Sequence, residues 1–313
     1  MRKTLLITVF LTVTTAVSHA AEFQFSEGAD INIGILKGDI VPSLTLPIHW
    51  GQSFYSVMGL HIYNTSESTT LSSFSESRNA IFSREIEATL SPIGYRNSVS
   101  FFSYFLSLNY NYRNTERKEF GYIHLPNVLG GDWVSHENNV NFDIHSVSLS
   151  AAIVYRAGNL YVKLSAAGSP WHYMNLKQDT MMKPIISNDA DLKTSSTGKG
   201  LSYQLLADTG YKFNEYLGIK VYLGYDFLPL KYDLELADYE AATSTFYFAK
   251  ERIDEENIKI IYGAQLFFPA ISAAKLSPTI GYEIREIYVK YKNSDSSSGS
   301  IEGVIIAGFT YNW

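Results

Sequence analysis

Hydrophobic and polar residues alternate along several long stretches of the chain. In the last thirteen residues, Ile305, Ala307, Phe309, Tyr311 and Trp313 fall on one face of an extended strand, because successive side chains of a strand point to opposite sides. Residues 98–112 and 217–227 show the same alternation over fifteen and eleven positions. A globular strand usually has five or six residues, whereas a tilted strand that crosses a membrane needs about 9 to 11. The pattern therefore predicts membrane-spanning β-strands.

The same alternation predicts about twelve strands in all. They span residues 29–36, 43–50, 53–63, 81–91, 98–112, 142–156, 159–168, 201–213, 217–230, 257–268, 276–291 and 301–313. Short connections (51–53, 92–97, 156–159, 214–216 and 269–275) alternate with longer ones (64–80, 113–141, 169–200, 231–256 and 292–300), and only the first connection, 37–42, is shorter than an external loop need be. Short periplasmic turns and longer external loops are typical of membrane barrels. We therefore expect an all-β fold, a transmembrane antiparallel up-and-down β-barrel of about twelve strands.

The other end of the chain has the layout of an export signal. Arg2 and Lys3 precede an apolar run at residues 5–17, and Ser18 and Ala20 are small residues at positions −3 and −1 of a cut before Ala21. This order is typical of a secretory signal peptide, and the apolar run is shorter than the roughly 20 residues of a spanning helix. We expect residues 1–20 to be the signal peptide and residues 21–313 to form one barrel domain.

These features together resemble those of Gram-negative outer-membrane β-barrel proteins, a class with a signal peptide, alternating strands and an aromatic C-terminal strand. The resemblance is to the class and to no particular family. It implies the bacterial outer membrane as the location, reached by export through the inner membrane with a cleaved signal. It also implies outer-membrane lipid and lipopolysaccharide as surroundings. The barrel-assembly machinery is the implied partner that reads Phe309, Tyr311 and Trp313.

Composition and charge exclude some partners. The chain has no cysteine, so it has neither a disulfide nor a lipid-attachment cysteine. Its net charge is −6, and removal of Arg2 and Lys3 with the signal leaves 23 basic against 31 acidic residues, a net charge of −8. We expect no nucleic acid partner from this balance.

The barrel lumen is the predicted place of function, and its polar wall carries both charge signs. The candidate lumen-lining residues are His49, His61, Glu85, Glu87, Lys163, Gln204, Asp208, Lys220, Asp226, Lys259, Glu283 and Arg285. Closure of the hairpin through residues 214–216 predicts that Gln204 faces Asp226 and that Asp208 lies diagonal to Lys220. One interpretation is a charge-compensated wall that simply makes the interior polar. The other is a narrow, mixed-charge conduit that orients a polar solute.

Some positions predicted to point inward are apolar. They are Val99, Phe101, Phe105, Phe142, Ile144, Ile261 and Phe267. Because Phe101 and Phe105 make one strand apolar on both faces, we expect something to pack against it from inside. The leading candidate is the loop at residues 169–200, which carries Trp171 and Met181. The alternative is a ligand such as a lipid or a nucleoside.

Signatures of catalysis and metal binding are weak. None of the seven His residues is followed two positions later by Ser, as the outer-membrane phospholipase pattern requires, and the Asp-His dipeptide of omptin-type proteases is missing. Asp143 and His145 share a face, which favours a polar pair at the outer rim. Glu85 and Glu87 have no recognisable nucleophile beside them. His49 and His61 should lie about 20 Å apart along their hairpin, too far to share an ion. We expect no enzyme activity, no metal and no cofactor.

Known barrel functions leave two main hypotheses. Acidic-oligosaccharide channels line their lumen with Arg and Lys, but here Arg78, Arg96, Arg113, Arg117 and Arg252 are predicted in loops or turns, which leaves Arg285 inward. The chain also resembles an autotransporter barrel in strand number and C-terminal motif, without the helix that threads such barrels. The leading hypothesis is a porin-like narrow channel or binding barrel for small polar solutes. The alternative is a structural or surface-interaction barrel, with an enzyme third.

Overall fold

The computed structural model describes residues 28–36, 39–50, 53–71, 77–124, 133–183, 186–187, 192–240, 245–268, 276–292 and 297–312. The predicted signal peptide at residues 1–20 and Trp313 of the predicted assembly signal lie outside these ranges. Within the described ranges, no helix is long and apolar enough to cross a membrane.

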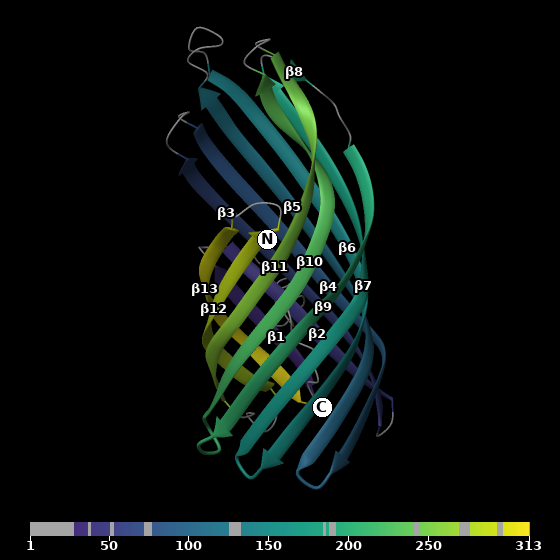
Figure 1. The fold of residues 1–313 in the computed structure, drawn as a ribbon. Coiled ribbons are helices and arrows are strands. Elements are labelled where there is room, and N and C mark those ends of the chain that lie inside the picture. Colours follow the sequence, from purple (N-terminus) through teal and green to yellow (C-terminus); the bar gives the residue numbers. More distant parts are fainter. Residues whose placement is uncertain are drawn as a thin grey trace, which may run out of the picture.

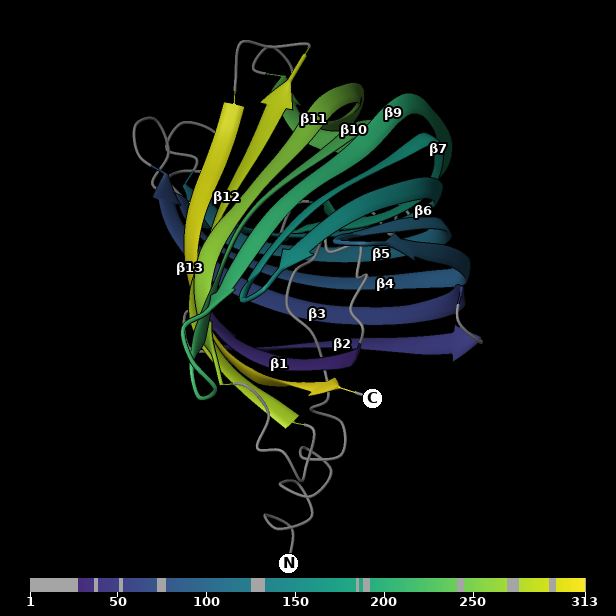
Figure 2. The same ribbon diagram turned by 90° about the horizontal axis from the view of Figure 1, so that it is seen from below.

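Thirteen strands form one antiparallel sheet (Figure 1). They are β1 (Gly28–Leu36), β2 (Asp39–Trp50), β3 (Phe54–Leu71), β4 (Ser77–Val99), β5 (Phe102–His124), β6 (Trp133–Ala157), β7 (Leu160–Lys183), β8 (Ile186–Ser187), β9 (Leu192–Lys212), β10 (Gly218–Glu240), β11 (Thr245–Phe267), β12 (Leu276–Tyr291) and β13 (Ser297–Asn312). The two-residue β8 pairs with the end of β7. Each of the other twelve has two neighbours, and the pairs β6–β7 and β1–β13 complete the ring. The view from below shows β1 beside β13 (Figure 2). The predicted twelve-stranded barrel is confirmed.

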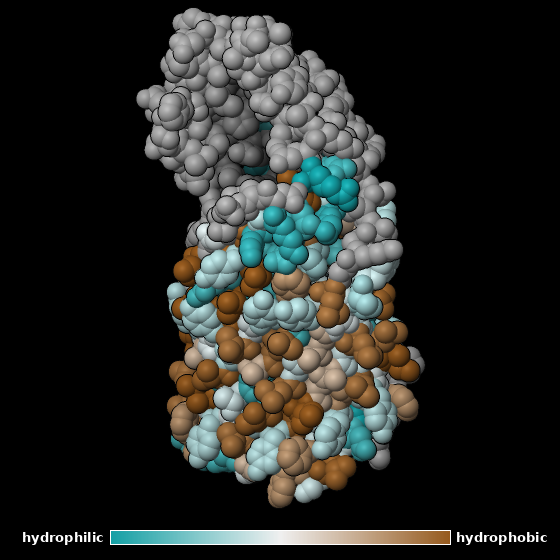
Figure 3. Space-filling view, in the orientation of Figure 1, coloured by the Kyte–Doolittle hydropathy of each residue, from teal (hydrophilic) through white to brown (hydrophobic). Residues whose placement is uncertain are grey.

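Side chains alternate between the two faces of the wall. On β5, Leu106 and Leu108 are 50% and 45% exposed, whereas Phe105 and Ser107 between them are 4% and 6% exposed. Similar exposed apolar residues occur on the other wall strands, and Figure 3 shows them gathered over the lower part of the molecule. A continuous outer band of this kind requires a hydrocarbon environment. We call the end with the turns at residues 100–101 and 158–159 the periplasmic end, and the opposite end, where strands continue beyond the band, the external end.

Several strands continue beyond the apolar band at the external end. On β6, exposed Val147 and Leu149 give way to Asn141 and Asp143 on the outer face. The predicted loops at 64–80, 113–141, 169–200 and 231–256 are therefore wrong, because most of their described residues belong to strands. These strands keep their ladder hydrogen bonds beyond the band, where the outer face meets water. Polar residues occupy the outer face there, so the apolar alternation that marks a spanning strand is absent. Figure 1 shows the resulting uneven rim, with β12 and β13 ending below the tops of β5 and β6.

One predicted turn was also wrong. Residues 92–97 belong to β4, and the chain reverses instead at Ser100 and Phe101, where Ser100 has a φ of 56°. The register between β4 and β5 shifts between Leu90 and Ile93. Such a bulge adds a residue and exchanges the faces of all later side chains. Val99 therefore lies exposed on the outside, and Phe101 is exposed in the turn, although both were predicted to point inward.

Three clusters of buried apolar side chains are described inside the barrel, and the two largest lie at different levels of the lumen. The lower apolar cluster consists of Tyr55, Val57, Phe105, Ala152, Val154 and Ala167. The upper apolar cluster consists of Val140, Ile144, Met174, Leu176, Leu228, Leu230 and Tyr232. Phe105 contacts Tyr55 of β3, with the ring centroids 6.3 Å apart. The predicted inward-folded loop is contradicted, because residues 169–183 and 192–200 belong to β7 and β9 of the wall.

Candidate functional site

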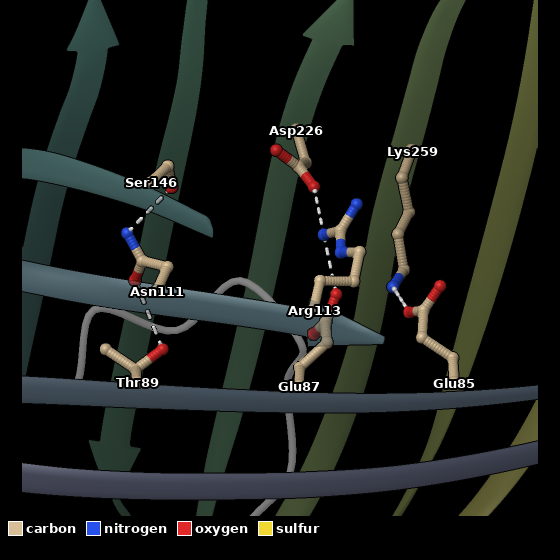
Figure 4. Close-up of polar contacts among 8 residues, drawn as sticks. All are labelled: Glu85, Glu87, Thr89, Asn111, Arg113, Ser146, Asp226 and Lys259. Carbon is tan, nitrogen blue, oxygen red and sulfur yellow. Dashed lines mark hydrogen bonds and ion pairs between the residues drawn. The ribbon is translucent and has the colours of Figure 1, made fainter. Parts of the chain in front are cut away.

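Two ion pairs cross the lumen between the two clusters (Figure 4). Glu85 and Glu87 lie on β4, and Arg113 lies opposite Glu87 on β5. On the far wall, Asp226 of β10 and Lys259 of β11 are opposite each other. The guanidinium of Arg113 contacts Glu87 and reaches Asp226 at 3.1 Å, and the ammonium of Lys259 lies 3.6 Å from Glu85. We call these five residues the charge layer.

The charge layer is balanced and well shielded from water. Three carboxylates face two cations, so its formal charge is −1. Asp226 and Glu87 are buried, and the other side chains are at most about one fifth exposed. Charges in such a place need partners, because the loss of one leaves its counterpart in a medium of low dielectric constant. The predicted place of Arg113 in a loop is wrong, since it lies within β5 and forms the centre of this layer.

A ladder of neutral polar side chains lies below the charge layer on β4, β5 and β6. Asn109 donates from Nδ2 to Ser150 at 2.9 Å and accepts a hydrogen bond from Ser107 at 2.8 Å. One step nearer to the charge layer, Asn111 donates to Ser148 at 2.9 Å and contacts Thr89. Buried polar groups are costly without partners, and the hydrogen bonds of this ladder supply those partners. The ladder therefore gives one side of the lumen a polar surface.

A small cavity opens beside the ladder and the charge layer. It measures about 70 Å³ and is lined by Asn111, Arg113, Ile144, Ser146, Ser148, Ala167, Gly168, Ser169, Ser202, Tyr203, Gln204, Asp226 and Leu228. Ala167 belongs to the lower apolar cluster, while Ile144 and Leu228 belong to the upper one. The cavity therefore borders both clusters, and its wall combines apolar and polar side chains. A single water needs roughly 10 to 15 Å³ measured in this way, so the cavity has room for a few waters or a very small solute.

A second group of charges lines the other side of the lumen. Asp208 of β9 lies 3.3 Å from the ammonium of Lys163 and also interacts with Lys220. The hydroxyl of Tyr222 donates to Glu283 at 3.0 Å, and Glu283 pairs with Arg285. Apart from Lys220, these side chains are buried. The predicted register is confirmed, because Gln204 faces Asp226 and Asp208 is diagonal to Lys220.

Other candidate residues lie elsewhere. His49 and His61 face Tyr55 and Ser43 in the ladder of β2 and β3, and the described structure does not extend to their side chains. Within the part of the chain that the structure describes, no group of three or more metal-ligating side chains occurs. Phe309 is exposed in the outer band, and Tyr311 pairs in the ladders of β1 and β12.

The polar pair Asp143 and His145 lies on the outer face of β6. Asp143 accepts a hydrogen bond from the hydroxyl of Tyr112 at 2.9 Å, and Nδ1 of His145 lies 2.6 Å from the hydroxyl of Tyr110. The aromatic partners come from β5, just where the outer face changes from apolar to polar. Aromatic side chains with a polar tip are typical of this level of a membrane barrel. The arrangement therefore fits an interfacial pair rather than a lumen site.

Comparisons with solved structures find other barrels. The translocator domain of the autotransporter NalP from Neisseria meningitidis is 13% identical over 100% of this chain and 95% of that chain, with a TM-score of 0.45. The Pseudomonas putida toluene transporter TodX is 10% identical over 96% of each chain, with a TM-score of 0.41. The β domain of the Bordetella autotransporter BrkA is 11% identical over 90% and 96%, with a TM-score of 0.40. No protein-family model and no curated protein matches the chain.

Similarity this low carries no function from those proteins to this one. The class rests on the chain's own strand pairing and on its outer apolar band. The chain has the fold of an outer-membrane β-barrel. In this barrel the residues that sequence reasoning missed are Arg113 and the cavity serines Ser169 and Ser202. Arg113 and Ser169 lie in segments predicted as loops, whereas Ser202 lies in the predicted strand 201–213.

Proposed function

We propose that the protein binds small polar solutes in its lumen and conducts them across the bacterial outer membrane. The observation that carries the proposal is the cavity beside the two apolar clusters, whose wall joins apolar side chains to polar ones and is bordered by Arg113 and Asp226. Binding sites for small molecules typically combine an apolar wall with a few convergent polar groups.

The lining of the cavity indicates which solutes suit it. Serine, asparagine and glutamine side chains supply neutral donors and acceptors, and one cation and one anion border the same space. A near-balanced wall gives no strong preference for either charge sign. We expect small neutral or zwitterionic solutes, about the size of glycerol or glycine, to be preferred over larger sugars.

The cellular location of the protein is part of the proposal. Residues 1–20 would act as a cleaved signal, and the C-terminal face of Phe309, Tyr311 and Trp313 would be read by the barrel-assembly machinery. The outer apolar band would contact lipid, and the polar faces above it would lie among lipopolysaccharide headgroups. Recovery of the mature protein in the outer-membrane fraction, with slower gel migration after heating, is the expected result. A soluble periplasmic product would contradict it.

A structural or surface-interaction barrel is the second candidate. The contents of the lumen favour it, because the apolar clusters and the cross-lumen ion pairs occupy part of the interior. The strands that continue beyond the band with polar outer faces favour it as well, since they present a broad surface outside the membrane. The two candidates differ in one measurable property, which is solute permeation.

The test is iso-osmotic swelling of proteoliposomes with solutes of increasing size. We expect glycerol and glycine to enter faster than in protein-free liposomes, and raffinose to be excluded. Ser146→Phe places a ring in the cavity and should reduce the glycerol rate severalfold. The matched control Val147→Phe adds a ring on the adjacent, lipid-facing position and should leave the rate unchanged. If no solute enters faster than in protein-free liposomes, the structural alternative is correct.

A further inference from the structure

The guanidinium of Arg113 has hydrogen-bonding capacity that its two carboxylate partners do not use. Its contacts with Glu87 and Asp226 both involve the same nitrogen, Nη2. Figure 4 shows the guanidinium between the two carboxylates, with both dashed lines meeting at that nitrogen. Among the residues that the structure describes, Nε and Nη1 of Arg113 have no partner. Because Arg113 lines the cavity and its side chain is 20% exposed, these N–H groups are available to a solute there.

Asp226 offers the opposite charge at the same cavity. Its Oδ2 accepts a hydrogen bond from Arg113 at 3.1 Å, and its Oδ1 has no partner within the described ranges. Gln204 lies opposite Asp226 in the ladder of β9 and β10, and Ser202 is two positions further along β9. All three side chains line the cavity. Glutamine and serine each carry an acceptor oxygen, so this side of the cavity suits a group that donates several hydrogen bonds.

The net charge of the charge layer favours a cationic group beside Asp226. Three carboxylates face two cations, which leaves one negative charge without a counterpart. Lys259 reaches Glu85. Glu87 and Asp226 therefore share Arg113. A buried charge is costly without a partner, so an ammonium group beside Asp226 compensates the excess, whereas a solute that carries only a carboxylate adds to it.

The size and the apolar part of the cavity limit the solute. A volume of about 70 Å³ corresponds to about five waters at roughly 10 to 15 Å³ each. Glycine is of about this size, and alanine adds a methyl group. Ala167, Ile144 and Leu228 border the same space. The carbon skeleton of such a solute therefore meets apolar side chains, while its charged ends meet Arg113 and Asp226.

We infer that the cavity is a binding site for small free amino acids, and that Arg113 and Asp226 determine this specificity. The carboxylate of the solute accepts charge-assisted hydrogen bonds from the unused N–H groups of Arg113. Its ammonium group donates to Oδ1 of Asp226 and to the neutral acceptors beside it. A zwitterion satisfies both charged groups without changing the net charge of the layer. The inference rests on the proposed function, because it names the solute class of the same cavity.

Glycine analogues that each lack one charge test the inference on the purified protein in detergent micelles. Glycolate carries a hydroxyl in place of the ammonium group, and glycinamide carries a neutral amide in place of the carboxylate. All three compounds have a methylene group, so saturation-transfer NMR near neutral pH, where glycinamide is cationic, measures each affinity by the same kind of signal. We expect glycine to bind at least about tenfold more tightly than either analogue, because each analogue loses a hydrogen bond between charged groups. Equal affinities of the three compounds would overturn the inference.

Two variants assign the two ends of the solute. Asp226→Asn keeps the shape of the side chain and removes its charge, so glycine should lose its advantage over glycolate and keep its advantage over glycinamide. Arg113→Gln should have the reverse effect. Asp143→Asn is the matched control, since it makes the same change on the outer face of β6, and it should leave all three affinities unchanged. Folding of each variant is checked by heat-dependent gel migration.

The outcomes separate this inference from the proposed transport. A folded Asp226→Asn protein that loses affinity for all three compounds equally would overturn the role of Asp226. The comparison of the three compounds on the unchanged protein decides the inference even where a variant does not fold. Swelling with glycerol and glycine but without selective binding refutes only the amino-acid site. Selective binding without any swelling refutes only the proposed transport.

Discussion

The two apolar clusters in the lumen differ in how the backbone holds them. All members of the lower apolar cluster lie on β3, β5, β6 and β7, strands that pair with neighbours on both sides at this level, with one register shift between Tyr55 and Val57. The upper apolar cluster joins β6 and β7 to residues 228–232 of β10, which lie beyond the last described pair between β9 and β10. Similar apolar side chains are therefore held by strands paired on both sides in one place, and partly by a segment with one described ladder in the other. The difference lies in the backbone pairing and not in hydrophobicity.

The largest effect should come from the lower apolar cluster. Phe105→Ala removes a ring that is 4% exposed and leaves a cavity that the paired strands cannot collapse. The free energy of unfolding should fall by about 3 to 5 kcal/mol, measured by urea titration in lipid vesicles. Leu106→Ala, at the lipid-facing neighbour, should cost clearly less. Equal losses would mean that the interior at this level is not a tightly packed core.

A smaller global effect should come from the upper apolar cluster. Leu230→Ala also removes a buried side chain, but Leu230 lies beyond the last described pair between β9 and β10. We therefore expect this part of β10 to open before the barrel unfolds, which limits the loss. We expect about 1 to 2 kcal/mol in urea titration. Hydrogen exchange should accelerate at residues 228–240 and stay unchanged at residues 102–112. Acceleration throughout both segments would show that the clusters unfold together.

The smallest effect should come from the outer face of the hairpin of β10 and β11. Lys231 pairs with Asp254 across the two strands on the water-facing side. Exposed pairs are typically worth only about 0.2 to 1 kcal/mol, so Lys231→Ala should change exchange at residues 228–240 by less than about fivefold. A change as large as that of Leu230→Ala would show that surface charges, and not the apolar inner face, set the stability of this hairpin.

The wall of the barrel was predictable from the sequence because lipid imposes a strict rule. Every second residue of a spanning strand must be apolar, and all twelve wall strands were found by that rule. Register within hairpins was predictable too, as with Gln204 and Asp226, because a short turn fixes the pairing. The rule applies only within the membrane. β5 was therefore predicted as a strand up to residue 112 and as a loop from Arg113 onward.

The cross-lumen contacts were not predictable from the chain. Asp226 and Arg113 lie on opposite walls, and their meeting depends on the strand number, stagger and tilt of the closed barrel. No local spacing encodes that geometry. The bulge near Pro92 shows a related limit, since one extra residue reversed the predicted face of Val99.

The ring closure between β1 and β13 also constrains how the barrel is made. Gly28 pairs with Asn312 at nearly opposite ends of the chain, whereas most other neighbouring strands are joined by a short turn or a single loop. Contacts of such long sequence separation form late, because the entropy of closing the intervening chain must be overcome first. The seam is also brief, with nine residues of β1 in register. An almost complete sheet with two unpaired edges would therefore precede the barrel, and unpaired edges invite association with other chains. Shielding these edges until the seam forms is the step of biogenesis on which this protein should depend most.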